Sequence, residues 1–190
     1  MPLSSPAPRE PIHVRRIECR GFRRSDGLWD IEGHMTDVKS YAFTNPEQHE
    51  VKAGDPVHDM WLRLTVDDTL AIQAIEAVTD SSPFRICPDI TPNFQRLIGL
   101  RLDSGYRRRA AELVGGAQGC THLVELLGPM ATTAFQTIAP ILHRERAERA
   151  KAEGKTENAA ERPRLLDTCY AFGSTSPVVK RRWPAFYTGM

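Results

Sequence analysis

The stretch GGAQGCTHLVELL, residues 115–127, carries the strongest indication of how this chain folds. Three glycines in five positions let the backbone turn tightly before a helix. After them, apolar residues recur at spacings of three and four, which is typical of a helix with one buried face. Pro129 predicts a kink or a break after Leu127. The apolar residues of this pattern are Leu123, Leu126, Leu127, Met130, Ala131, Ala134, Phe135 and Ile138.

The same stretch places Cys120 and His122 at the start of the helix. The free N–H groups and the positive dipole end there favour a thiolate. A thiolate beside an imidazole suits a metal site or a nucleophile. On a regular helix two side chains two positions apart diverge by roughly 200°, so both can bind one ion only if Cys120 precedes the helical turns. Alternatively, Cys120 is a small buried hydrophobe and His122 a surface residue.

Upstream of this helix, alternating patterns predict strands over 12–24, 28–36, 55–66 and 70–78, with a hairpin turn at 25–27. Residues 37–54 are interpreted as a polar connection. Helices are expected over 93–102 and 106–114. The predicted fold class is therefore α+β, an antiparallel sheet backed by helices. Inward-facing side chains are expected to be Trp29, Ile31 and Met35 in the second strand, and Leu70, Ile72, Ala74 and Val78 in the fourth.

Composition divides the chain into four segments. Residues 1–11 contain four prolines and are interpreted as a flexible leader, and 12–143 as the core domain. Residues 144–162, rich in charge and alanine, predict a helical tether. The C-terminal segment 163–190 regains large aromatic side chains and is expected to dock on the core domain.

The charge balance and the cysteine content restrict the classes of function that the protein can have. The chain has 190 residues, 25 basic and 24 acidic side chains and a net charge of +1, which gives no electrostatic argument for nucleic-acid binding. Its apolar runs are too short to span a bilayer. Four irregularly spaced cysteines without a signal peptide indicate reduced thiols and a cytoplasmic location. The oligomeric state stays open.

Potential metal ligands lie at the ends of several predicted elements. His58 begins the inward face of the third strand, Cys87 lies on a proline-flanked loop, and Cys120 with His122 opens a helix. Thiolates and imidazoles form a suitable ligand set for zinc or iron. The predicted metal ligands are therefore Cys87, Cys120, His122 and His58.

Two resemblances bear on this interpretation. The stretches RRIECRGFRRSDGLWDIEGHMTD, GDPVHDMWLRLTVDD, GGAQGCTHLVELLGPMATTAFQT and LDTCYAF…VVKRRWPAFY identify the chain as a member of a bacterial family of unknown function, with GCTHLxELL as a signature. The layout of residues 56–59, 86–89 and 119–122 also resembles U-type iron–sulfur scaffold proteins. That resemblance implies a scaffold-like fold, but His58 stands where the scaffolds have a cysteine, and His122 follows Cys120 instead of preceding it. This difference favours a stable zinc or iron site over transient cluster assembly.

Three functions follow from these observations. The first is an accessory protein that binds zinc, iron or an iron–sulfur cluster and serves another enzyme or metalloprotein. The second is an enzyme with Cys120 as nucleophile and His122 as base, for acyl transfer or thiol chemistry. The third is an interaction module without metal.

Overall fold

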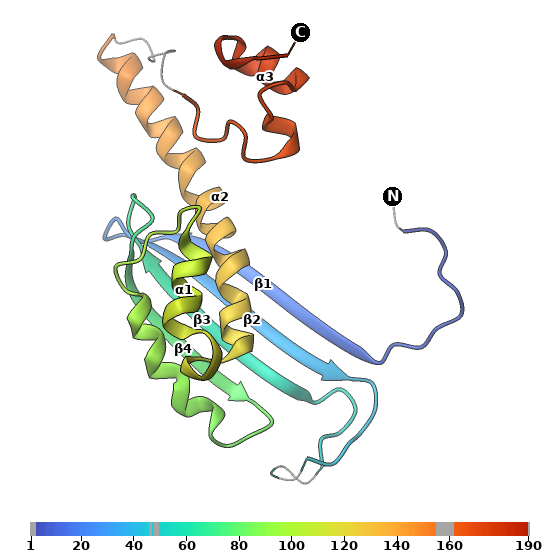
Figure 1. Ribbon diagram of the computed structural model, residues 1–190. Coiled ribbons are helices and arrows are strands. Elements are labelled where there is room, and N and C mark those ends of the chain that lie inside the picture. The colour runs from blue at the N-terminus through green and yellow to red at the C-terminus, as the bar shows by residue number, and fades with distance from the viewer. Residues whose placement is uncertain (1–2, 46, 48–49, 155–161, 190) are drawn as a thin grey trace. The chain divides into compact units, whose positions relative to one another are not determined.

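The computed structural model describes residues 3–45, 47, 50–154 and 162–189. The chain divides into two compact units, residues 1–143 and 144–190. Figure 1 shows a sheet with helices against one of its faces in the first unit. The α+β class and the antiparallel sheet predicted from the sequence are thus confirmed.

The sheet is an antiparallel meander in the order β1-β2-β3-β4. Its strands are β1 (His13–Arg23), β2 (Trp29–Lys39), β3 (Pro56–Val66) and β4 (Ile72–Ser81). The β1–β2 turn is the predicted hairpin, in which Gly27 adopts a φ of 87°, a conformation that favours glycine. Each strand therefore pairs with its neighbours in sequence, and the register places Asp37 beside both Arg15 of β1 and His58 of β3.

The helical layer contains η1 (Cys87–Leu97), α1 (Tyr106–Val114), η2 (Gly116–Gln118) and α2 (Thr121–Ala152). Helix α2 passes close to the sheet because two glycines leave room for it. A Cβ atom at Gly21 would lie 2.8 Å from the Cβ of Thr137, and one at Gly33 would lie 2.6 Å from the Sδ of Met130. The first turn of α2, which carries His122, lies beside the end of β2 and the start of β3.

The core of the first unit lies between the sheet and these helices. Trp29, Ile31 and Met35 are buried as predicted, and they meet the apolar face of α2. The residues of α2 buried against the sheet are Leu123, Leu126, Leu127, Met130, Ala134 and Ile138.

Helix α2 and β4 differ from the sequence-based expectations. The break considered at Pro129 is absent, since α2 continues through Pro129 and Pro140. A proline removes only one hydrogen-bond donor, and the buried flanking residues Leu127 and Met130 hold the adjoining turns in place. In β4 the register shifts opposite Thr65 and Val66, which reverses the alternation, so that Ile75 is buried while Val78 is 38% exposed.

The segment predicted as a helix over 93–102 is instead the 3-10 helix η1, which begins earlier and ends at Leu97. Pro88 and Pro92 both lie within it, and each lacks an N–H donor, which disfavours a regular α-helical ladder. Helix α1 spans the residues expected from the sequence.

The second unit, taken by itself, continues from α2 and contains η3 (Tyr170–Phe172), α3 (Pro177–Arg182) and η4 (Pro184–Phe186). Asp167 organises its loop, because its carboxylate accepts the Ser174 N–H and pairs with Arg162. Phe172 packs at 5.2 Å from Trp183, centroid to centroid. Part of the predicted tether, residues 155–161, lies outside the described residues. None of the helices described combines the length and apolarity needed to cross a lipid bilayer.

Candidate metal centre

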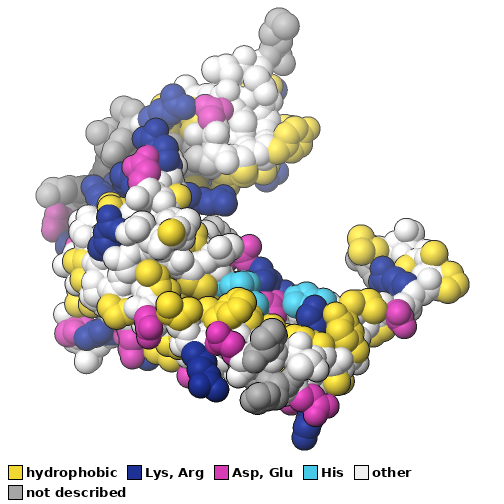
Figure 2. Space-filling model, turned by 60° about the horizontal axis from the view of Figure 1, so that its bottom comes forward, with side chains coloured by type: hydrophobic (Ala, Val, Ile, Leu, Met, Phe, Trp, Pro, Cys, Tyr) yellow, Lys and Arg dark blue, Asp and Glu magenta, His cyan; other side chains and the backbone are white. Residues whose placement is uncertain are grey.

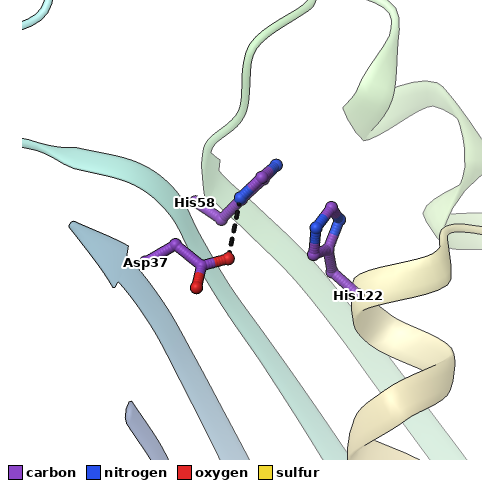
Figure 3. A group of neighbouring side chains, drawn as sticks. All are labelled: Asp37, His58 and His122. Carbon is purple, nitrogen blue, oxygen red and sulfur yellow. Dashed lines mark hydrogen bonds and ion pairs between the residues drawn. The ribbon is translucent and has the colours of Figure 1, made fainter. Parts of the chain in front are cut away.

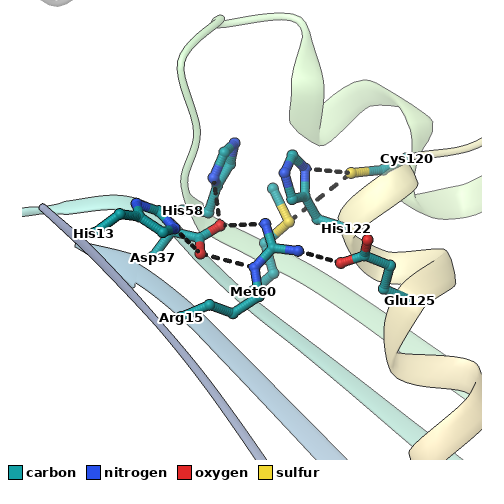
Figure 4. A network of polar contacts seen from close by, with 8 residues as sticks. All are labelled: His13, Arg15, Asp37, His58, Met60, Cys120, His122 and Glu125. Atoms are coloured by element: carbon teal, nitrogen blue, oxygen red, sulfur yellow. Dashed lines mark hydrogen bonds and ion pairs between the residues drawn. The ribbon is translucent and has the colours of Figure 1, made fainter. Parts of the chain in front are cut away.

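The centre of the site is Asp37, a carboxylate with 1% of its side chain exposed. Strand β2 continues past its predicted end at residue 36, so Asp37 falls on the buried face that begins with Trp29. Its Oδ1 accepts from His13 Nε2 at 3.0 Å and from Arg15 Nε at 2.8 Å. Its Oδ2 accepts from Arg15 Nη2 at 2.7 Å and from His58 Nδ1 at 2.9 Å. Asp37 thus collects four donors from both neighbouring strands (Figure 4).

These contacts fix the charge of the carboxylate. Burial raises the pKa of Asp37, but the hydrogen bonds and charge of Arg15, with the hydrogen bond from His58, outweigh burial and lower the pKa to about 2. An ionised carboxylate only accepts hydrogen bonds, so Nδ1 of His58 carries the proton and Nε2 keeps a free lone pair. Asp37 therefore fixes the tautomer and orientation of the His58 ring.

His122, from the first turn of α2, stacks on His58 with ring centroids 3.7 Å apart and planes inclined by 32°. Asp37, His58 and His122 each offer one ligand atom, and these atoms all lie within 4.8 Å of one another (Figure 3). Figure 2 shows histidine side chains reaching the surface beside hydrophobic and basic side chains. Asp37 is buried, whereas His58 and His122 are partly exposed.

The pKa of each imidazole is lowered, which favours the neutral form. Burial lowers the pKa of His58 most, and the neighbouring His122 lowers it further, against the opposing effect of Asp37. Burial also lowers the pKa of His122, as does the charge of Arg15, while Asp37 and Glu125 oppose the shift. Neutral imidazoles present the lone pairs that a metal ion requires.

Cys120 lies beside this pair but outside the group of three. It immediately precedes α2, and its carbonyl accepts the Val124 N–H at 2.9 Å. Cys120 therefore lies before the helical turns, as is required if its side chain and that of His122 are to bind one ion. Its Sγ is 3.9 Å from His122 Nδ1 and 3.9 Å from Met60 Sδ. The thiol and the two imidazoles thus form a continuous cluster.

Cys87 opens η1 and takes no part in the three-ligand group found among the described residues. All four cysteines are free thiols. Of the four ligands predicted from the sequence, the structure brings His58 and His122 together and places Cys120 beside His122, while Cys87 stays a prediction.

Sequence reasoning missed Asp37, Arg15 and His13. The polar connection predicted over 37–54 includes Asp37, although extending the alternation of Trp29, Ile31 and Met35 by two positions places a carboxylate on the buried face. Arg15 also pairs with Glu125 of α2, which ties the edge strand to the helix. No local motif indicates that contact, because its partners are 110 positions apart.

The lowered pKa values predict that metal-free protein loses stability on acidification. An unfolded histidine titrates near 6.5, whereas folded His58 and His122 titrate lower. Below about pH 7 the unfolded chain therefore binds more protons than the folded chain, and the protein loses stability as the pH decreases. A second loss is expected as pH falls from about 4 towards the pKa of Asp37 near 2. The melting temperature of the wild type, measured in chelator from pH 8 to 5, should show the first loss. Its slope against pH should be smaller for the double variant His58→Gln/His122→Gln. An equal slope in both proteins would contradict it.

These features define an α+β protein that assembles a buried carboxylate and two imidazoles between an antiparallel sheet and the start of a long helix. The chain belongs to the family described as Protein of unknown function (DUF2889), whose model matches residues 13–136 and includes every residue of this cluster. Membership in a family of unknown function, inferred from the sequence, is thereby confirmed. No curated protein and no solved structure matched the chain.

Proposed function

We propose that this protein binds one zinc or iron ion through His58, His122 and Cys120, with Asp37 orienting the first ligand. The observation that supports it most strongly is the hydrogen bond from His58 Nδ1 to the buried carboxylate. Metal-binding histidines characteristically donate their second ring N–H to a carboxylate or carbonyl, which fixes the tautomer and raises ligand basicity. His58 already has this arrangement, and its Nε2 accepts no hydrogen bond from the described residues.

Asp37 fits the role of an orienting group better than that of a direct ligand. A carboxylate has about four lone-pair sites. Those of Asp37 face His13, His58 and two N–H groups of Arg15. A metal bound directly to Asp37 would have to displace the Arg15 guanidinium. The positive charge of Arg15 is itself balanced by Asp37 and Glu125, so it does not leave the site strongly repulsive to a cation.

The donor types favour a single zinc or iron ion over a cluster. In a tetrahedral site, zinc ligands at about 2.0–2.3 Å from the ion lie roughly 3.3–3.8 Å apart. The ligand atoms of Asp37, His58 and His122 lie within 4.8 Å of one another. The two imidazoles would therefore have to move closer together around an ion, with the Cys120 thiol, 3.9 Å from His122 Nδ1, as the third donor. Iron–sulfur clusters require several thiolates, commonly four cysteines or two with two histidines. Cys120 supplies one thiol here, and a cluster would need Cys87 as well.

The metal content of purified protein tests the proposal. Protein from a host replete in zinc and iron should carry close to one equivalent of metal, and Cys120→Ser or His122→Ala should lose most of it. The matched control is His34→Ala. His34 donates to Asp59 at 2.7 Å on the outer face of the sheet, so it has the same kind of partner without the second imidazole and thiol. Metal-free wild type of normal stability would refute the proposal and favour an interaction module.

A second candidate function is an enzyme with Cys120 as nucleophile. The contact of 3.9 Å between Cys120 Sγ and His122 Nδ1 supports it, since His122 could act as base and is stacked on a histidine that Asp37 orients. Mapping iodoacetamide labelling by mass spectrometry separates the two functions. Fast, pH-dependent labelling of Cys120 in metal-free protein supports the nucleophile, whereas protection that a chelator removes supports the metal.

With a bound metal, the protein would act as an accessory to another enzyme or metalloprotein in the cytoplasm. The two imidazoles and the Cys120 thiol are partly exposed, so an ion could be passed to a partner without unfolding the sheet. The side chains of Asp37 and Met60, by contrast, are buried and would keep the ligands in place.

A further inference from the structure

Strand β1 leaves one long edge unpaired within the described residues. The opposite edge of the sheet is covered where β4 begins, because the segment after η1 pairs with Ile72 of that strand. The Ile72 N–H donates to the Leu100 carbonyl at 2.9 Å, and the Gly99 N–H donates to the Ile72 carbonyl at 2.8 Å. The edge of β1 has eleven residues and is the blue strand at the border of the sheet in Figure 1. A long open edge is a template for pairing with another strand.

The backbone N–H and C=O groups of alternate β1 residues point to opposite sides of the strand, which determines which residues can pair with a further strand at its open edge. The Ser40 N–H donates to the Ile12 carbonyl, and the Arg24 N–H donates to the Leu28 carbonyl. Backbone groups alternate along an antiparallel ladder, so the even-numbered residues of β1 bond to β2 and the odd-numbered ones point outward. A partner strand must therefore meet residues 13, 15, 17, 19, 21 and 23.

The same edge exposes apolar side chains on both faces. Ile17 is 43% exposed on the helix-covered face. Ile12 and Phe22, on the outer face, are 46% and 44% exposed. Arg16, also on the outer face, is exposed and makes no ion pair in the described part of the chain, whereas Glu18 pairs with Arg20. These side chains would gain partners from a strand of complementary sequence.

We propose that two copies of this chain pair antiparallel through β1, with the two-fold axis at Ile17, to form a continuous eight-stranded sheet. In this register Ile17 meets Ile17 of the second copy, and Ile12 meets Phe22 twice. Arg16 lies directly opposite Glu18 of the second copy, also twice. This register also places outward-pointing backbone groups opposite each other, since residue 15 meets 19 and residue 13 meets 21.

The neighbouring registers that keep outward-pointing backbone groups opposite each other are less favourable. An axis at Glu18 places that glutamate opposite its own copy and Arg16 opposite Arg20. An axis at Cys19 places Glu18 opposite Arg20 but offsets this attraction by placing Arg15 opposite Arg23. An axis at Arg16 places that arginine opposite its own copy. Like charges directly opposite each other destabilise a strand pair, whereas opposite charges and apolar pairs stabilise it. Charge and apolar matching thus select the axis at Ile17.

A charge exchange tests this register by sedimentation equilibrium of the full chain. Wild type should be a dimer, and Arg16→Glu should weaken dimerisation about 10-fold, since two attractive pairs become repulsive. Glu18→Arg should weaken it similarly, and the double variant Arg16→Glu/Glu18→Arg should restore it. A mass of one chain at every concentration, or a double variant weaker than either single variant, would overturn the proposal.

Disulfide trapping provides a second measurement. Residues directly opposite in a hydrogen-bonded antiparallel pair have Cα atoms about 5.5 Å apart, within disulfide range. Mild oxidation of Ile17→Cys/Cys19→Ser should therefore yield a covalent dimer, whereas the matched control Cys19→Ser should not. A wild-type dimer cross-linked through native Cys19 would place the axis at Cys19 and overturn the register.

Discussion

Asp37→Ala should destabilise the first unit by about 3–5 kcal/mol, the cost of removing one partner from a buried ionic network. The change leaves Arg15, His13 and His58 without the acceptor that they share. Because the side chain is 1% exposed, water does not replace the lost carboxylate without opening the structure. Urea denaturation monitored by tryptophan fluorescence measures the change, since Trp29 is buried in the same sheet.

The matched control for this prediction is Asp59→Ala. Asp59 accepts a hydrogen bond from a histidine on a neighbouring strand, as Asp37 does, but it is 27% exposed on the outer face, and His34 is its one ion-pair partner among the described residues. An exposed pair of this kind contributes about 0–1 kcal/mol. Similar losses for both variants would show that Asp37 is not the structural centre of the cluster.

Gly21→Ala should destabilise the first unit by about 1–3 kcal/mol through overpacking. The added Cβ would lie 2.8 Å from the Cβ and Cγ2 of Thr137 and closer still to its Oγ1, so α2 would have to move away from β1. Thermal or urea unfolding measures the loss. Thr137→Ala in the same chain should recover part of it, since that change removes two of the three crowded atoms.

Gly128→Ala is the control for this second prediction. Gly128 lies within α2, and a Cβ there would approach no closer than 3.7 Å to Arg107 Nε. Alanine is favoured over glycine in a helix by about 1 kcal/mol, so this variant should be neutral or more stable. If Gly21→Ala is equally neutral, helix and strand are farther apart than the structure places them.

The sequence predicted the architecture well where a regular period persists. Alternation placed Trp29, Ile31 and Met35 in the core, and the spacing after Gly119 defined the buried face of α2. It failed where one residue breaks the period. The register shift in β4 exchanged the faces of Ile75 and Val78, and a bulge cannot be read from alternation alone.

Only part of the candidate site could be predicted from the sequence. His58, Cys120 and His122 are predicted as site residues because imidazoles and thiols are common metal ligands and catalytic groups. Asp37 is not, because a lone acidic residue at the end of a strand is most often solvated. Its importance depends on the pairing of β2 with both β1 and β3, which brings Arg15 and His58 to one carboxylate. Such convergence is a property of the sheet and not of any local stretch.

The meander order of the strands also has a consequence for the kinetics of folding. Every strand pairs with its neighbour in sequence, so the sheet closes through local connections, the longest being residues 40–55 between β2 and β3, with a modest loss of chain entropy. Asp37 and His58 can meet as soon as the β2–β3 hairpin forms. His122 reaches them only when α2 docks, across a far larger separation in sequence. We therefore expect a folding intermediate trapped before α2 docks to contain the carboxylate–histidine pair but not the complete cluster.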